Sequence, residues 1–226
     1  MAQRRGIDNL LDSGGRTKWP HGKKTRLMMT TEGGDAARVI KLIDEDRASV
    51  DVANEHGITA LHLAPNVECV RALVARGADV NALSMKTSWM PAYATPFETA
   101  IENDRAAVVR EFVAMGQDVD KFALGPRPSW GPQTPIMACL QHSKAKTKVL
   151  EALLSLGADV NVASTYEASP LWNRVTRADL DSVQLLVDAG ADLSKRSEGM
   201  TPLGWAINNA MSDVEAFLRS RGAPPA

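Results

Sequence analysis

Apolar residues recur along this chain in short stripes that follow the period of an α-helix. Each stripe has two apolar positions three residues apart and a third directly after them, a spacing that places the side chains on one helix face. The stripes are Val39, Leu42 and Ile43; Val70, Leu73 and Val74; Val109, Phe112 and Val113; Leu150, Leu153 and Leu154; Val183, Leu186 and Val187; and Val214, Phe217 and Leu218. Each stripe predicts a helix with one buried face.

A further helix is predicted ahead of each stripe by a threonine or serine. These residues are Thr25, Thr59, Thr95, Thr134, Ser169 and Thr201, and in the last four proline follows directly. A hydroxyl residue followed by proline is typical of a helix start, because the hydroxyl caps free backbone N–H groups and proline suits the first turn. Glycine closes the later stripes at Gly77, Gly116, Gly157, Gly190 and Gly222. The starts recur every 32 to 39 residues, which predicts stacked repeats.

The residues that recur resemble the ankyrin repeat family. Residues 59–64 read Thr-Ala-Leu-His-Leu-Ala and residues 201–203 read Thr-Pro-Leu, similar to the Thr-Pro-Leu-His-x-Ala signature of that family. Residues 77–81 and 157–161 read Gly-Ala-Asp-Val-Asn, which is similar to the family's closing sequence. The resemblance covers about residues 21–226.

The resemblance implies an all-α repeat fold. We expect an ankyrin solenoid of six helix-turn-helix repeats joined by β-turn or β-hairpin fingers. The expected repeats span about 22–54, 55–88, 91–127, 131–165, 166–197 and 198–226, which together form one domain over residues 21–226. Residues 1–20 are expected to be a basic N-terminal tail or an extension that caps the first repeat.

Composition and charge narrow the class of partner. The 226 residues are 44% hydrophobic and carry a net charge of −1, which favours neither nucleic acid nor an anionic membrane. No long apolar run predicts a membrane span or a signal peptide, so we expect an intracellular protein, cytoplasmic or nuclear. Residues 1–26 differ, because seven basic residues against two acidic ones give +5. This segment predicts either a solvated tail or cap, or an arm that contacts phosphates or an import receptor. The thiols Cys69 and Cys139 are expected to be buried and unpaired.

Two of the predicted fingers are longer than the others. Val80 to Thr95 and Val119 to Thr134 are each fifteen residues apart, whereas Val160 to Ser169 takes nine. Insertions of this kind often lie on the binding face of a repeat protein. The long fingers hold residue types that are enriched at protein interfaces: Met85, Lys86, Trp89, Tyr93, Phe122, Arg127 and Trp130. The alternative is that Trp89 and Trp130 fold back and pin their own loops.

Further partner-binding residues follow from the resemblance. Ankyrin proteins bind partners in a concave groove that is formed by finger tips and the ends of the first helices. Carried over position by position, that groove would include Glu102, Asn103, Gln141, His142, Tyr166 and Arg177. The alternative for each residue is a solvated surface position.

Two repeats depart from the common pattern. Thr59 and Gly77 are only eighteen residues apart, and Pro65 falls where the first helix of that repeat would end, so we expect a short helix there. Ankyrin-type inhibitors of cyclin-dependent kinases share a shortened second repeat, and this makes a kinase-inhibitor role one alternative. In the fifth repeat, Arg174 stands where the family has a small residue, and a buried arginine there would need carboxylate or carbonyl partners.

No catalytic or metal-binding constellation is predicted. The four histidines are scattered, and His62 matches the family's structural histidine, which bonds to the backbone between repeats. We therefore predict a module without enzymatic activity, cofactor, metal or small-molecule substrate. It would bind another protein through its concave face and two long fingers, as a monomeric scaffold, adaptor or masking inhibitor. The alternatives are the kinase-inhibitor role and contact with nucleic acid or chromatin through the basic arm.

Overall fold

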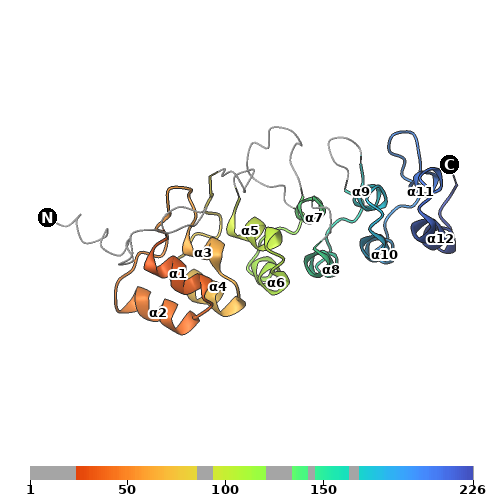
Figure 1. The fold of residues 1–226 in the computed structure, drawn as a ribbon. Coiled ribbons are helices and arrows are strands. Elements are labelled where there is room, and N and C mark those ends of the chain that lie inside the picture. The colour runs from red at the N-terminus through yellow and green to blue at the C-terminus, as the bar shows by residue number, and fades with distance from the viewer. Residues whose placement is uncertain (1–23, 86–93, 121–133, 142–145, 163–167, 226) are drawn as a thin grey trace. The chain divides into compact units, whose positions relative to one another are not determined.

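The fold is seen in a computed structural model, which describes residues 24–85, 94–120, 134–141, 146–162 and 168–225. Within these ranges the chain forms twelve helices and an isolated antiparallel bridge between Ser197 and Met200. Figure 1 shows these helices along the chain. By their contacts they fall into two compact units, with the boundary after Phe112.

The first unit contains three helix pairs. Its helices are α1 (Arg26–Glu32), α2 (Ala36–Asp44), α3 (Ala60–Leu63), α4 (Val67–Val74), α5 (Pro96–Glu102) and α6 (Ala106–Ala114), whose last turn crosses the boundary. First helices pack on first helices, since α3 lies against both α1 and α5, and α4 packs against α2.

The second unit repeats this arrangement. Its helices are α7 (Pro135–Cys139), α8 (Thr147–Ser155), α9 (Pro170–Val175), α10 (Leu180–Asp188), α11 (Pro202–Asn208) and α12 (Ser212–Ser220). Here α11 packs on α9, while α10 packs on both α8 and α12.

The predicted helix starts are confirmed. The hydroxyl of Thr25 accepts a hydrogen bond from the Met28 N–H at 3.1 Å, and the hydroxyl of Ser169 accepts one from the Trp172 N–H at 3.2 Å. The four prolines after the capping residues occupy the first position of their helices. Each cap satisfies a backbone N–H that a helix leaves without a partner.

The ends of the second helices follow the glycine pattern with one exception. Gly77, Gly116, Gly157 and Gly190 have positive φ, between 88° and 98°, which a residue without Cβ adopts at little cost. The first repeat has no glycine at this place, and Arg47 takes the left-handed conformation with φ 53°.

The predicted stripes form the cores of both units. Val39, Val70, Val109 and Val183 are fully buried, as are Leu73, Leu153 and Leu186. Cys69 and Cys139 are buried free thiols, as expected. Within each unit, one helix pair packs against the next, so the helix-pair repeat predicted from the sequence is confirmed.

Candidate protein-binding surface

The two ends of the first long finger are fixed to each other by Ser84 and Ala94. The Ser84 N–H donates to the Ala94 carbonyl at 3.0 Å, and the Ser84 hydroxyl donates to the same oxygen at 3.1 Å. The Ala94 N–H donates back to the Ser84 hydroxyl at 3.2 Å. Ser84 is fully buried. We call this pair the finger neck; it joins the two described stretches of chain on either side of residues 86–93.

His62 anchors the finger neck to the helix pair before it. Its Nδ1 accepts from the Thr59 N–H at 3.1 Å, so Nε2 carries the proton and donates to the Ala94 carbonyl at 3.0 Å. Burial lowers the pKa of His62, which keeps the ring neutral in this role. The predicted role of His62 as a structural residue that bonds to the backbone of the next repeat is confirmed.

The preceding finger packs tightly against the base of the long finger. The Met85 N–H donates to the His56 carbonyl at 2.6 Å. Gly57, with φ 71°, approaches so closely that a Cβ there would lie 2.7 Å from the Leu83 carbonyl oxygen. The base of the long finger is therefore held by the neck on one side and by the preceding finger on the other.

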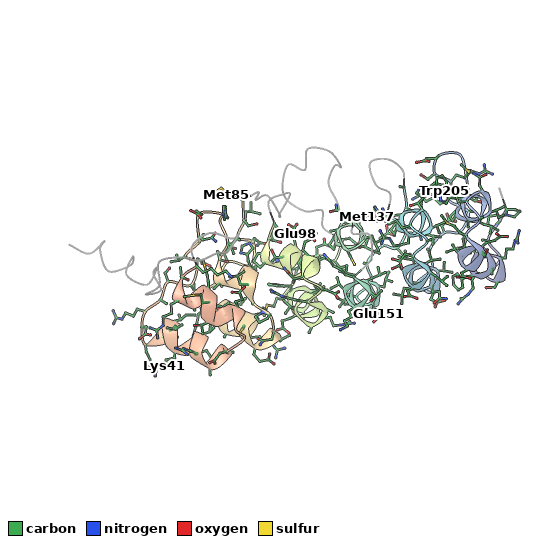
Figure 2. All side chains as sticks on the ribbon, viewed as in Figure 1. Lys41, Met85, Glu98, Met137, Glu151 and Trp205 are labelled. Atoms are coloured by element: carbon green, nitrogen blue, oxygen red, sulfur yellow. The ribbon has the colours of Figure 1, made fainter. Side chains whose placement is uncertain are left out.

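Two apolar side chains at this base are exposed. Leu83 is 47% exposed and Met85 is 50% exposed, the highest values among the large hydrophobic side chains of the described residues. Figure 2 shows Met85 on the finger side of the first unit, opposite Lys41 on α2. The sequence predicted Met85 as a binding residue but missed Leu83, although Leu83 lies in the same stretch between the closing sequence and the long loop.

The predicted helix-end residues are divided between the two units. In the first unit Glu102 is the last residue of α5, and Asn103 caps that helix, with its side-chain amide donating to the Thr99 carbonyl at 2.8 Å. In the second unit Gln141 follows α7 and is partly buried, while Arg177 follows α9 and is exposed.

The structure thus brings Met85, Glu102 and Asn103 into one unit, and Gln141 and Arg177 into the other. The basic segment 1–20 lies outside the described residues. So do the remaining predicted binding residues, which are Lys86, Trp89, Tyr93, Phe122, Arg127, Trp130, His142 and Tyr166.

Two arginines that bond to helix ends are also present, and the sequence foresaw only one of them. The Arg105 guanidinium donates to the Ala64 carbonyl at 2.9 Å, at the end of α3. Arg174, which is fully buried, donates to the carbonyl of Leu140 at the end of α7 and to the carboxylate of Asp179 at 3.3 Å. The expectation that a buried Arg174 needs such partners is confirmed.

The short first helix predicted for the second repeat is also confirmed, since α3 has four residues. However, α7 in the second unit has only five. Shortening is therefore not particular to the second repeat, which weakens the one observation that favoured a kinase-inhibitor role.

Within the described ranges, no three His, Cys, Asp or Glu side chains lie close enough to hold a metal ion. None of the helices found there has both the length and the apolar character needed to cross a bilayer. The described residues instead form a surface on which apolar side chains are exposed at a finger and polar side chains are exposed at helix ends.

Comparison with known proteins gives this surface its context. Residues 56–84 match the model of the ankyrin repeat. The chain is 30% identical over 94 residues to the potassium channel AKT1 of Oryza sativa, a match that covers 41% of this chain and 10% of the channel. It is 26% identical over 230 residues to the ankyrin repeat and KH domain-containing protein mask-1 of Caenorhabditis elegans, which covers 97% of this chain and 8% of that protein. The chain thus spans about a tenth of the length of these relatives.

Solved structures share the fold. The ankyrin repeat domain of Bcl-3, a member of the IkappaB family, superposes with a TM-score of 0.68 at 23% identity, covering 89% of this chain and 87% of that one. A chain in the complex of a predatory endopeptidase of Bdellovibrio bacteriovorus with an immunity protein gives a TM-score of 0.64 at 24% identity, over 87% and 98% of the two chains. With the repeat match and the helix pairs described above, these likenesses identify the chain as an ankyrin repeat protein with the all-α solenoid fold of that family.

Proposed function

We propose that this protein binds another protein without catalysing a reaction, using the long fingers and the ends of the first helices as its binding surface. Ankyrin repeats form extended surfaces for protein interaction, and their fold is not in itself catalytic. The bound partner would be held in place, recruited or masked, so the protein would act as a scaffold, adaptor or masking inhibitor.

The observation that carries the proposal is the fixed base of the first long finger. Ser84, Ala94 and His62 restrain that base through hydrogen bonds that are largely buried. A loop whose ends are already ordered loses less conformational entropy when a partner docks on it. Leu83 and Met85 stand exposed beside these bonds, and their removal from water would favour binding.

Polar residues at the helix ends supply the second element of the proposed surface. In the first unit Asn103 is exposed and directly follows α5, and in the second unit Arg177 is exposed and lies two residues after the end of α9. Their amide and guanidinium groups can make hydrogen bonds to a partner backbone or to carboxylates. An apolar anchor with polar groups around it is the usual composition of a protein interface.

The proposal is tested by capturing partners from the native cell with the wild-type protein and with the variant Met85→Ala/Trp89→Ala. We expect the variant to lose the specifically captured protein while its circular dichroism and melting temperature stay close to those of the wild type. The matched control is Ile40→Ala/Met115→Ala, which truncates two exposed apolar side chains that do not belong to the finger: Ile40 lies on α2, and Met115 directly follows α6.

Capture that is equal in all three proteins would contradict the proposed surface. A variant that loses both its fold and its partner, while the control keeps both, would show that the finger residues pin their own loop instead of contacting a partner.

A further inference from the structure

The outward side of the first helix pair carries a shallow depression of about 360 Å³. It is lined by residues from both helices and from their connection, namely Arg26, Met29, Thr30, Gly33, Asp35 and Arg38. Met29 is 37% exposed, so part of the lining is apolar. α1 and α2 pack against α3 and α4, and Arg26, Met29 and Arg38 of the lining stay exposed despite this contact.

Three residues of this lining occupy positions that are covered in other repeats. They are the first and fifth positions counted from the start of the first helix, and the third position of the second helix. In the pairs α3–α4, α5–α6, α9–α10 and α11–α12 every residue at these positions is buried: Ala60, Ala64, Cys69, Pro96, Ala100, Val108, Pro170, Arg174, Ser182, Pro202, Ala206 and Val214. In the first pair, by contrast, Arg26 and Arg38 are exposed and Thr30 is half-buried. The face that a preceding repeat would cover is therefore open among the described residues.

This open face has a positive charge. The guanidinium groups of Arg26 and Arg38 form no ion pair in the part of the chain that the structure describes. The carboxylate of Asp35 is already used, since it accepts the Arg38 N–H at 2.9 Å as the cap of α2. An occupant with both apolar and acidic side chains would fit such a surface.

Residues 5–15, which lie outside the described residues, have the sequence of a second helix. Ile7, Leu10, Leu11 and Asp12 have the same spacing as Val183, Leu186, Val187 and Asp188, which belong to α10. Gly14 follows Leu11 by three residues, as Gly190 follows Val187. Gly14 and Thr25 are eleven residues apart, which is the distance from Gly190 to Thr201.

We propose that residues 5–15 form a helix equivalent to the second helices of the later repeats and cover the open face of α1 and α2. Ile7, Leu10 and Leu11 would then pack on Met29 and on the aliphatic stems of the two arginines, whose charged ends stay at the edge. The spacing of Gly14 and Thr25 gives the connecting finger the length of one found elsewhere in this chain.

Charge supports the same occupant. Asp8 and Asp12 lie one helical turn apart and flank the apolar stripe, so they can approach Arg26 and Arg38. Elsewhere in the chain, an aspartate at the end of a second helix bonds to an arginine of the next repeat, since Asp44 bonds to Arg76 at 2.6 Å and Asp188 bonds to Arg221 at 2.8 Å. Those two arginines follow second helices, so their places differ from those of Arg26 and Arg38. Asp12 directly follows the last apolar residue of its stripe, Leu11, as Asp44 follows Ile43 and Asp188 follows Val187. The proposal goes beyond the proposed function and stands whether or not a partner is found.

The experiment is amide hydrogen exchange on the full chain, comparing Leu10→Glu/Leu11→Glu with the control Asn9→Glu/Ser13→Glu. Both variants add two negative charges, but the control places them on the opposite face of the proposed helix. We expect exchange in residues 26–44 to be about tenfold faster in the first variant, because the cover is lost, and unchanged in the control. In the wild type, residues 5–12 should exchange more slowly than an unstructured chain.

Equal exchange in the wild type and the first variant would overturn the proposal. An equal acceleration in both variants would also overturn it, because it would be an effect of charge and not of the apolar stripe. Exchange in α9 to α12 reports separately that the rest of the protein stays folded.

Discussion

At the scale of single residues, His62 joins more parts of the first unit than any other polar side chain described above. It caps α3 through Thr59, and it donates to the carbonyl of Ala94, which also closes the finger neck. Its position could be predicted from the Leu-His pair after Thr59. Its link with Ser84 could not, because nothing in the sequence indicates that the two residues share one acceptor.

The stability of the protein should decrease as the pH falls below about 6.5, the ordinary pKa of histidine. Burial lowers the pKa of folded His62, while the bond to Ala94 and the carboxylate of Asp79 partly oppose this shift. The unfolded chain therefore binds a proton at a higher pH than the folded chain does, so the stabilisation is complete above 6.5 and is lost below it. Each unit of pKa difference corresponds to about 1.4 kcal/mol at acid pH.

The measurement is the melting temperature at pH 7.5 and pH 5.5, a window above the range in which carboxylates titrate. His62→Gln serves as the comparison, because glutamine can accept from Thr59 and donate to Ala94 without titrating. The decrease should be smaller in the variant. An identical decrease in both proteins would show that another group is responsible.

At the scale of helices, the two shortest first helices are each completed by an arginine from the following repeat. A helix leaves its last carbonyl groups without partners, and a helix of four or five residues has few bonds of its own. Arg105 reaches the carbonyl of Ala64 after α3, and Arg174 reaches that of Leu140 after α7. Burial lowers the pKa of both arginines, as expected for guanidinium groups held among buried carbonyls.

Replacing Arg105 with methionine should destabilise the first unit by about 1 to 3 kcal/mol, because a carbonyl at the end of α3 loses its partner. Arg105→Lys should restore part of the loss, since an ammonium group can reach one acceptor. Urea denaturation measures both. The control is Arg71→Met, which breaks the exposed ion pair with Glu111 and should change stability less. If Arg71→Met costs as much as Arg105→Met, the carbonyl bonds are not what stabilises the end of α3.

Most helices could be predicted from the sequence, whereas the places where a helix or repeat departs from the common pattern could not. Four helix starts could be predicted because each has a capping hydroxyl residue followed directly by proline, and both act within the first turn: Thr95, Thr134, Ser169 and Thr201. The short α7 has no proline at its end, and the bond that Arg174 donates to the Leu140 carbonyl there is a tertiary contact. The end of the first repeat at Arg47 could not be predicted either, because the backbone of this arginine adopts the left-handed conformation that glycine usually adopts. At the candidate site, the composition of the long finger predicted Met85 as a binding residue. The buried hydrogen bonds that hold the base of this finger could not be predicted, because they join residues that are far apart in the sequence.

At the scale of the whole molecule, the helices gather into two compact units, and packing within each unit runs from one helix pair to the next. In repeat proteins stability is approximately a sum of repeat terms and nearest-neighbour terms. A cavity should therefore weaken the pairs around it more than the pairs far along the chain.

Leu186→Ala and Leu73→Ala test this with equivalent changes in the two units. Both leucines are fully buried on second helices, and each truncation should cost about 2 to 5 kcal/mol. Hydrogen exchange under native conditions should show lost protection mainly in α7 to α12 for Leu186→Ala, and mainly in α1 to α6 for Leu73→Ala. Each variant is the control for the other, since the chemistry of the change is the same. Equal loss of protection along all helices in both variants would show that the units unfold as one, and local packing would then not be the scale at which this protein is stabilised.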